Sequence, residues 1–370
     1  MTKYSELLDE KFIEKLIEFR EKNDEKIFVK SNLREAFGDG ILVAAESEIA
    51  KSQDKKSRIV ALSADLSESV GLSNFRENLP ENYVEVGIAE QNLVSIAAGM
   101  AHVGLKPFAM SYAAFNPGRN YEQIRTNIAL NDVPVVVVGT HAGLNVGPDG
   151  ATHQMLEDVA MMRAMPNMAV FAPADATESR SLAKFLANEK WQKPAYVRLP
   201  RAESASIFRE NYEYVDTEPQ EVLREGKDIT LLGFGSMTMQ NLLAAEILAH
   251  KNIDAEVVHV SNLSSQSIRK LCESVAKTRA IIVSAEEEKS AGFGDMIGAK
   301  ILQEMAKIND ISRKNYAENF IKNSLIKFER IAVGDKFGQS GTAEELAGFY
   351  GIDAKNIAKK AENLLFGDEG

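Results

Sequence analysis

Residues 133–154 read VPVVVVGTHAGLNVGPDGATHQ, an apolar run followed by a glycine-rich loop. The β-branched run is typical of a strand that is buried on both faces, as in a parallel sheet. In the loop, Gly143, Gly147 and Gly150 permit positive φ or close approach of another backbone. The stretch therefore predicts a central strand of an α/β fold, with a polar loop at its carboxyl end.

Further apolar runs with β-branched residues lie on both sides of this stretch. They span residues 58–63, 82–86, 168–173 and 195–199. Helical segments separate most of these runs, which predicts a parallel sheet with crossover helices. We assign residues 31–202 to this domain, with Ser31 as the N-cap of its first helix. Residues 1–30 are predicted to be a helical extension, because apolar side chains recur at helical spacing at Leu8, Phe12, Leu16 and Phe19.

A polar, acidic stretch at residues 203–225 is predicted to be a linker. After it the alternation of strands and helices restarts, with predicted strands at 228–235, 255–260, 280–285 and 329–334. Residues 226–370 are therefore predicted to form a second α/β domain. Within it, the polar segment 308–327 is interpreted as an inserted helix without an assigned role. The predicted fold class is α/β, with two consecutive domains that each contain a mainly parallel sheet flanked by helices.

Composition narrows the class of protein. The 370 residues are 45% hydrophobic and 26% charged, as in an ordinary globular protein, and carry a net charge of -11. The sequence has no basic cluster on an aromatic-rich face, which argues against a nucleic-acid partner. The single cysteine, Cys272, excludes an intrachain disulfide framework. Since no apolar run approaches membrane-spanning length and no signal peptide is evident, we expect a cytoplasmic protein without a membrane partner.

Two segments carry groups suited to chemistry. Glu90 opens an Ala- and Gly-rich helix after the predicted strand 82–86, at the sheet edge where α/β proteins bind ligands. A first-turn glutamate alone is more often a partner of the helix dipole than a catalyst. The loop after residue 140 strengthens the functional interpretation, because it brings His141, Asp149 and His153 to another strand's carboxyl end.

Two alternative interpretations of these patterns are weaker. A zinc site is disfavoured because His141 and His153 are too far apart for a helical pair and the chain has no second cysteine. A dinucleotide fingerprint is disfavoured because Thr238 stands where the third glycine of GFGSMT would belong. The ordinary reading of GFGSMT is a tight turn between a strand and a helix.

The same segments carry a family resemblance. Together with NPGRNYEQIRTNIA at 116–129 and PADATE at 173–178, they resemble the pyrimidine-binding domain of the transketolase family. The second half, including GDKFGQSGTAEELAGFYGI at 334–352, is similar to that family's C-terminal domain. The resemblance covers about residues 31–370, and its motifs match in order and spacing across both domains.

The resemblance implies a site for thiamine diphosphate. Glu90 matches the glutamate that hydrogen-bonds N1′ of the aminopyrimidine and thereby promotes loss of the C2 proton. Phe115 matches the aromatic residue that stacks on the same ring, and Tyr112 matches its neighbour, although two aromatic residues could equally belong to a core.

The resemblance also implies groups that bind a sugar phosphate. His141 and His153 match histidines at the sugar substrate and at the donor's carbonyl end, and Asp149 matches an aspartate that binds a substrate hydroxyl. Arg34, Ser69 and Arg201 resemble the phosphate-binding residues. Arginine suits that role because its planar guanidinium binds two phosphate oxygens at once.

Half of the family's site is not evident in the sequence. The family holds the diphosphate and Mg²⁺ (or Ca²⁺) with a GDG motif and a downstream asparagine. A GDG does occur at 38–40 with Asn74 downstream, but it falls inside a predicted helix, so we reject it as a metal site. The chain thus resembles the C-terminal subunit of a two-chain transketolase, with an N-terminal partner subunit that supplies the diphosphate-binding domain, and a heterotetramer is expected.

Three alternatives remain open at the level of sequence. A 1-deoxyxylulose-5-phosphate synthase shares the GIAEQ-like segment at 87–91 but has a different loop around His141. The β subunit of a 2-oxoacid dehydrogenase lacks the VGxDGxTHQ pattern. A scaffold of the same fold without activity would not need Glu90, His141, Asp149 and His153 together.

Overall fold

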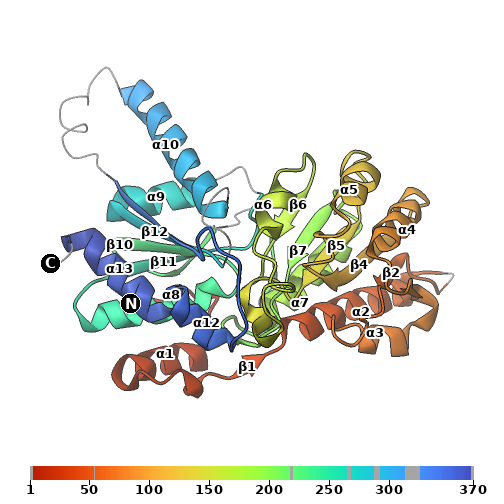
Figure 1. Cartoon of the computed structure of the whole chain (residues 1–370), viewed down its shortest axis with the longest axis horizontal. Coiled ribbons are helices and arrows are strands. Elements are labelled where there is room, and N and C mark those ends of the chain that lie inside the picture. The colour runs from red at the N-terminus through yellow and green to blue at the C-terminus, as the bar shows by residue number, and fades with distance from the viewer. Residues whose placement is uncertain are drawn as a thin grey trace.

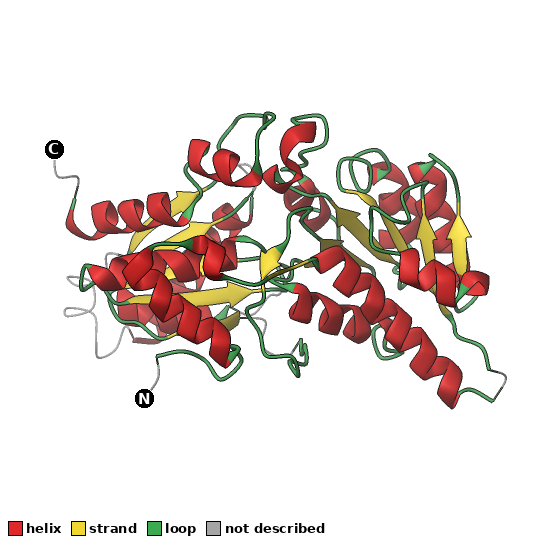
Figure 2. Cartoon of the chain, turned by 90° about the horizontal axis from the view of Figure 1, so that it is seen from below, coloured by secondary structure: helices red, strands yellow, loops and turns green. Residues whose placement is uncertain are grey.

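The computed structural model describes residues 3–53, 55–216, 220–264, 268–286, 292–312 and 326–367. Two α/β domains lie side by side, each with its own sheet between helices (Figures 1 and 2). The strands of the first sheet are, in spatial order, β3 (Tyr83–Glu85), β2 (Ile59–Ser63), β4 (Lys106–Tyr112), β5 (Val136–Thr140), β7 (Ala195–Arg198) and β6 (Ala169–Phe171). All its neighbouring strands run parallel.

Helices cover both faces of this sheet. One face packs on α2 (Leu33–Lys51), α3 (Ser73–Asn78) and α7 (Ala176–Ala187). The other packs on α4 (Glu90–His102), on α5 (Tyr121–Gln123) with the following π-helix η3 (Ile124–Ala129), and on α6 (Asp158–Arg163). Val136 and Val138 of β5 belong to one apolar core, and Val135 and Val137 to the other. The uninterrupted valine run is thus buried on both faces, as predicted.

The second sheet has the order β13 (Lys327–Ile331), β12 (Ala280–Ser284), β10 (Ile229–Gly233), β11 (Ala255–Val260) and β9 (Gln220–Arg224). Only its edge strand β9 runs antiparallel to its neighbour in this sheet. On one face lie α8 (Met237–His250), α12 (Ala343–Phe349) and α13 (Ala354–Phe366), and on the other α9 (Arg269–Thr278) and α10 (Phe293–Ser312). The predicted fold class, two α/β domains with mainly parallel sheets, is confirmed.

The N-terminal extension connects the two domains. Its helix α1 (Glu10–Lys22) begins at Asp9, whose carboxylate accepts the N–H of Phe12. The predicted apolar face packs against α8 of the second domain. After the short helix η1 (Glu25–Ile27), strand β1 (Lys30–Ser31) pairs with β8 (Ser204–Ala205) and leads into α2 (Figure 1).

Four details differ from the sequence-based prediction. The central strand β4 was not predicted, and β9 forms at the end of the segment that we assigned to a linker. Asn32, rather than Ser31, caps α2 by accepting the N–H groups of residues 34 and 35. Strand β13 starts two residues before the predicted strand 329–334, at Lys327. Residues 313–325 of the segment 308–327 lie outside the described residues. In the described part of the chain, no helix has both the length and the apolar composition needed to cross a membrane.

The GDG at 38–40 lies in the middle of α2, and its glycines serve helix packing. A Cβ on Gly38 would lie 1.9 Å from the carbonyl oxygen of Gly71, and one on Gly40 would lie 2.5 Å from the carbonyl oxygen of Arg180. Asp39 accepts a hydrogen bond of 2.9 Å from Asn74. A packing role therefore accounts for these glycines.

Candidate active site

The candidate residues gather at the carboxyl edge of the first sheet. Ser69 follows β2, Glu90 follows β3, His141 follows β5 and Arg201 follows β7. Because the strands are parallel, their carboxyl ends meet at one edge, where an open α/β sheet binds its ligands. Arg34 reaches the same edge from the first turn of α2.

Glu90 is the first residue of α4 and is 2% exposed. Its carboxylate accepts a hydrogen bond of 2.7 Å from Arg119, whose side chain is 47% exposed. The Arg119 guanidinium also lies over the Phe115 ring, 4.4 Å from its centre. One cation therefore joins the buried carboxylate to the aromatic ring predicted to stack on the pyrimidine.

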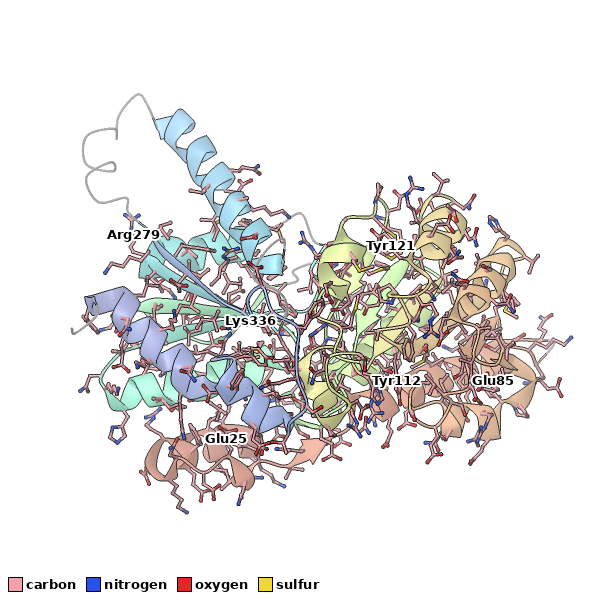
Figure 3. The ribbon with its side chains drawn as sticks, viewed as in Figure 1. Glu25, Glu85, Tyr112, Tyr121, Arg279 and Lys336 are labelled. Carbon is pink, nitrogen blue, oxygen red and sulfur yellow. The ribbon has the colours of Figure 1, made fainter. Side chains whose placement is uncertain are left out.

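The rings of Phe115, Tyr112, His141 and His153 pack against one another beside Glu90 and Arg119. The rings of Tyr112 and Phe115 are stacked with centres 6.1 Å apart, and Tyr112 stacks on His141 at 3.8 Å. His153 meets Phe115 edge-on, with ring centres 5.5 Å apart. Tyr112, at the end of β4 (labelled in Figure 3), thus has its ring next to those of Phe115 and His141.

His141 has the uncommon backbone φ of 54° and is buried. Burial, and then the charges of Arg34, Arg201 and His153, lower the pKa of His141 to about 3. Its imidazole is therefore neutral at physiological pH and can accept a hydrogen bond at one ring nitrogen.

The predicted phosphate-binding residues form a second group beside His141. Arg34 donates to the carbonyl oxygens of Ser69 and Arg201, so the structure joins these residues through the backbone rather than through the Ser69 hydroxyl. Arg201 donates to the carbonyl of Val146 at 2.7 Å and lies 3.7 Å from a carboxylate oxygen of Asp149. The buried Nε of Arg34 has no hydrogen-bond partner among the described residues.

Sequence analysis missed two residues at this site. Arg119 pairs with Glu90, and Asn120 donates to the Glu90 carbonyl at 2.9 Å. Both belong to the segment 116–129 that carried the resemblance. Arg119 lies four residues after Phe115, in a turn where the Arg119 N–H donates to the Phe115 carbonyl.

Comparisons with known proteins agree with this geometry. Residues 42–205 match the family model "Transketolase, pyrimidine binding domain", and residues 220–314 match "Transketolase, C-terminal domain". A putative transketolase C-terminal section from Methanocaldococcus jannaschii is 35% identical over 335 residues, which are 90% of this chain and 96% of that protein. The chain belongs to the transketolase family.

Some of the similar proteins match this chain over nearly their whole length, whereas others are longer proteins that match over about half of theirs. A 6-deoxy-6-sulfo-D-fructose transketolase subunit from a Clostridium species is 32% identical over 90% of this chain and 94% of its own length. A solved structure described as a split gene transketolase, inactive beta4 tetramer, superposes with a TM-score of 0.72 and 34% identity, covering 90% of this chain and 98% of that one. By contrast, the match to a 1-deoxy-D-xylulose-5-phosphate synthase from Dictyoglomus thermophilum spans 47% of that enzyme.

Membership in the transketolase family implies dependence on thiamine diphosphate, and the residues present fit its pyrimidine end. Next to Glu90 is an open cavity of about 490 Å³, lined by residues 88–92, Ser95, Arg119 and Gln123. It presents the buried carboxylate of Glu90 together with Arg119, whose guanidinium lies over the Phe115 ring. In the ranges that the structure describes, no three histidine, cysteine or carboxylate side chains gather to hold a metal ion.

Proposed function

We propose that the chain is the C-terminal subunit of a two-chain transketolase, which transfers a two-carbon ketol unit from a ketose phosphate to an aldose phosphate. The observation that carries this proposal is the continuous row of contacts from Glu90 through Arg119, Phe115 and Tyr112 to His141. It connects a buried carboxylate and a buried histidine within one site, which supports a role for Glu90 in pyrimidine binding and for His141 in substrate binding. The likeness to other transketolase sections and subunits supports the same assignment.

Each residue group has a role in this reaction. Bound thiamine diphosphate supplies the nucleophilic carbon that attacks a ketose carbonyl. The Glu90 carboxylate holds or shares the proton at N1′ of the pyrimidine, and Phe115 orients the ring by stacking. His141 and His153 would form hydrogen bonds to the sugar oxygens, His141 as a neutral imidazole.

The substrate's other end would lie against the cationic group. Arg34 and Arg201 bind the phosphate, for which guanidinium groups offer paired N–H donors. Asp149 accepts a hydroxyl of the sugar and orients the chain of carbons between the phosphate and the histidines. These contacts would bind phosphorylated sugars in preference to unphosphorylated ones.

A partner subunit completes the site in this proposal. It would hold the diphosphate and Mg²⁺ (or Ca²⁺), and the assembly would be a heterotetramer. The similar solved structure is described as an inactive tetramer of beta chains, which supports the need for a partner in proteins of this kind.

Two measurements test the proposal: calorimetric titration of cofactor binding, and an assay of ketol transfer. With a partner that carries a diphosphate-binding domain present, thiamine diphosphate and Mg²⁺ should bind tightly, and Glu90→Ala should weaken that binding. Xylulose 5-phosphate should then be consumed when ribose 5-phosphate is added. The proposal would be overturned if Glu90→Ala left the affinity for thiamine diphosphate unchanged, or if the complex showed no ketol transfer.

A second candidate is a 1-deoxyxylulose-5-phosphate synthase-like reaction, favoured by 32% identity to such an enzyme. A panel of donors separates the two, since that reaction requires pyruvate rather than a ketose phosphate. Pyruvate would likewise be the type of donor used by a 2-oxoacid dehydrogenase-like complex. A scaffold without activity would turn over none of these donors.

A further inference from the structure

The segment 141–154, here called the histidine loop, carries His141, Asp149 and His153. Its backbone has positive φ at residues 141, 143, 147 and 150. At His141 this conformation is unfavourable for an L-residue, so it persists only where surrounding contacts impose it. First-domain groups hold part of this loop, since Ala142 donates to the Leu199 carbonyl and Gly143 to the Met155 carbonyl, and second-domain groups hold it as well.

Glu286, which follows β12 of the second domain, is 3% exposed and lies against the histidine loop. Its carboxylate accepts the backbone N–H of Asn145 at 2.9 Å and the Asn145 side-chain amide at 2.7 Å. The Ser236 hydroxyl, from the turn before α8, donates to it at 3.1 Å. Asn145 of the loop therefore donates three hydrogen bonds to one buried carboxylate of the other domain.

The buried Glu286 carboxylate needs the hydrogen bonds from Asn145 and Ser236 because it shares its cation with another carboxylate. Arg198 lies 3.6 Å from the Glu286 carboxylate and also donates to the buried Asp158, at 3.1 Å. One guanidinium thus faces two buried carboxylates. A buried carboxylate whose cation is shared depends on N–H and O–H donors for its remaining solvation; Asn145 supplies the N–H donors and Ser236 the O–H donor.

Packing fixes the loop against the same pair. A Cβ on Gly143 would lie 2.6 Å from the Glu286 carboxyl carbon and 2.6 Å from an Arg198 nitrogen. The backbone at Gly143, two residues after His141, therefore rests directly on the ion pair.

The second domain also holds the far end of the loop, through the segment around Lys336 that lies at the domain junction (Figure 3). Gln154, beside His153, donates to the carbonyls of Gly147 and Gln339 at 3.0 Å each. A Cβ on Gly150, next to Asp149, would lie 2.8 Å from the Ser340 hydroxyl. The histidine loop is thus held at both ends by second-domain groups.

We propose that Glu286 is a positioning residue, through which the second domain clamps the histidine loop in the geometry that presents His141 and Asp149 to substrate. The value of this clamp for catalysis rests on the proposed function. The clamp itself is a property of the chain and can be tested without any substrate.

The first test is amide hydrogen exchange of the isolated chain. In Glu286→Ala, peptides covering 141–154 should exchange at least about tenfold faster, while peptides covering β5 stay unchanged. Asn145→Ala should give a smaller increase in the same peptides, and it keeps the test valid if Glu286→Ala does not fold. Glu286→Gln, which keeps an acceptor oxygen, should recover most of the protection.

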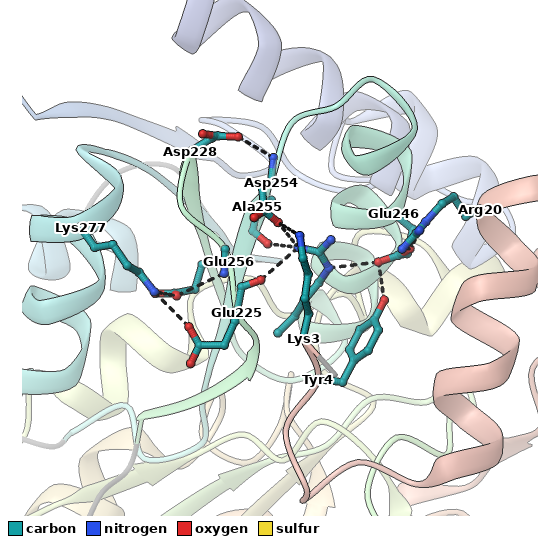
Figure 4. Close-up of polar contacts among 12 residues, drawn as sticks. Lys3, Tyr4, Arg20, Glu225, Asp228, Glu246, Asp254, Ala255, Glu256 and Lys277 are labelled. Carbon is teal, nitrogen blue, oxygen red and sulfur yellow. Dashed lines mark hydrogen bonds and ion pairs between the residues drawn. The ribbon is translucent and has the colours of Figure 1, made fainter. Parts of the chain in front are cut away.

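The matched control is Glu256→Gln. Glu256 is also a buried carboxylate of the second sheet, but it pairs with Lys277 away from the histidine loop (Figure 4). It should leave exchange at 141–154 unchanged. Unchanged exchange in folded Glu286→Ala and Asn145→Ala, or equal loosening by Glu256→Gln, would overturn the clamp.

The second test uses the complex with its partner subunit. Asn145→Ala and Glu286→Ala should lower kcat/KM for the sugar phosphate by about 10- to 100-fold, with unchanged affinity for thiamine diphosphate, because a misplaced group loses that much rate. Loosened exchange with unchanged kinetics would overturn the positioning role. If the wild-type complex shows no ketol transfer, the proposed function fails, whereas the exchange measurement still decides the clamp.

Discussion

Glu90 holds a carboxylate almost out of contact with water, and Arg119 is the cation that offsets its burial. Replacing Glu90 with Ala should lower turnover of the complex by about 10²- to 10⁴-fold, the usual effect of losing a group that transfers or shares a proton. Stability should fall little, by about 1 kcal/mol, because water reaches the freed guanidinium. Steady-state kinetics and thermal unfolding check the two effects, and Glu90→Ala with full turnover would contradict the assigned role.

Arg201 should act on substrate affinity rather than on the proton steps. Arg201→Ala should raise KM for a sugar phosphate by about 10- to 100-fold, the worth of hydrogen bonds to a charged group. Arg180→Ala is the control, since Arg180 is a half-exposed arginine of the same domain that pairs with Asp39. Equal KM values for the two variants would contradict a role of Arg201 in phosphate binding.

For single residues, the sequence allowed prediction of those site residues that follow a strand, because the carboxyl ends of parallel strands lie at one edge of the sheet. It did not predict that Arg34 and Arg201 bond to backbone carbonyls, or that Arg119 pairs with Glu90. Those contacts depend on how α2 and the segment after β4 pack, which spacing along the chain does not specify. The same holds for Glu286, which is 141 residues from Asn145, the loop residue that it contacts.

Among the elements, the N-terminal extension is bound to the second domain by a buried charge network (Figure 4). Glu246 of α8 accepts hydrogen bonds from Tyr4, from Arg20 at 2.6 Å and from Arg224 at 3.1 Å. The Arg224 side chain is 2% exposed. The extension thus takes part in the stability of the second domain.

Glu246→Ala should therefore cost about 3–5 kcal/mol in free energy of unfolding, because it leaves the buried Arg224 without its main carboxylate. Tyr4→Phe should cost about 1 kcal/mol, the net worth of one hydrogen bond. Lys22→Ala, which removes an exposed pair with Glu18, is the control. Urea denaturation measures all three, and a Glu246→Ala loss no larger than the control would show that the network is not stabilising.

Strand prediction succeeded where apolar residues run together and failed where they do not. Strand β4 begins with Lys106 and Pro107, yet the lysine ammonium is buried and donates to the Asn188 and Trp191 carbonyls. Strand β9 contains Glu221, which accepts a hydrogen bond from the Tyr212 hydroxyl, and Arg224, which donates to the Glu246 carboxylate. In both strands tertiary partners satisfy polar groups that sequence alone assigns to the surface.

At the scale of the molecule, the two domains share a buried cluster of titratable groups. His259 of β11 lies 3.0 Å from Glu178 of α7, with Asp175 and Glu221 nearby. Burial raises the pKa of Asp175 to about 6 and that of Glu221 to about 7, and Glu178 raises the pKa of His259 despite burial. All three groups hold their protons more tightly in the native state than in the unfolded chain.

Stability from these groups is present at low pH and is lost as the pH rises through their native pKa values. For Glu221 the window runs from its ordinary value of 4.5 to about 7. Glu221→Gln removes this titration and keeps an acceptor for Tyr212. Between pH 5 and pH 8, wild type should lose about 2 kcal/mol of unfolding free energy relative to Glu221→Gln. Urea denaturation at the two pH values measures it, and parallel losses would contradict the assignment.

The active site is proposed to be shared between this chain and a second chain. The direct measurement is ketol transfer from xylulose 5-phosphate to ribose 5-phosphate, with thiamine diphosphate and Mg²⁺ in excess. The homogeneous chain should show no transfer, whereas the chain mixed with a diphosphate-binding partner should show transfer that Glu90→Ala abolishes. Full turnover by the homogeneous chain alone would contradict the account.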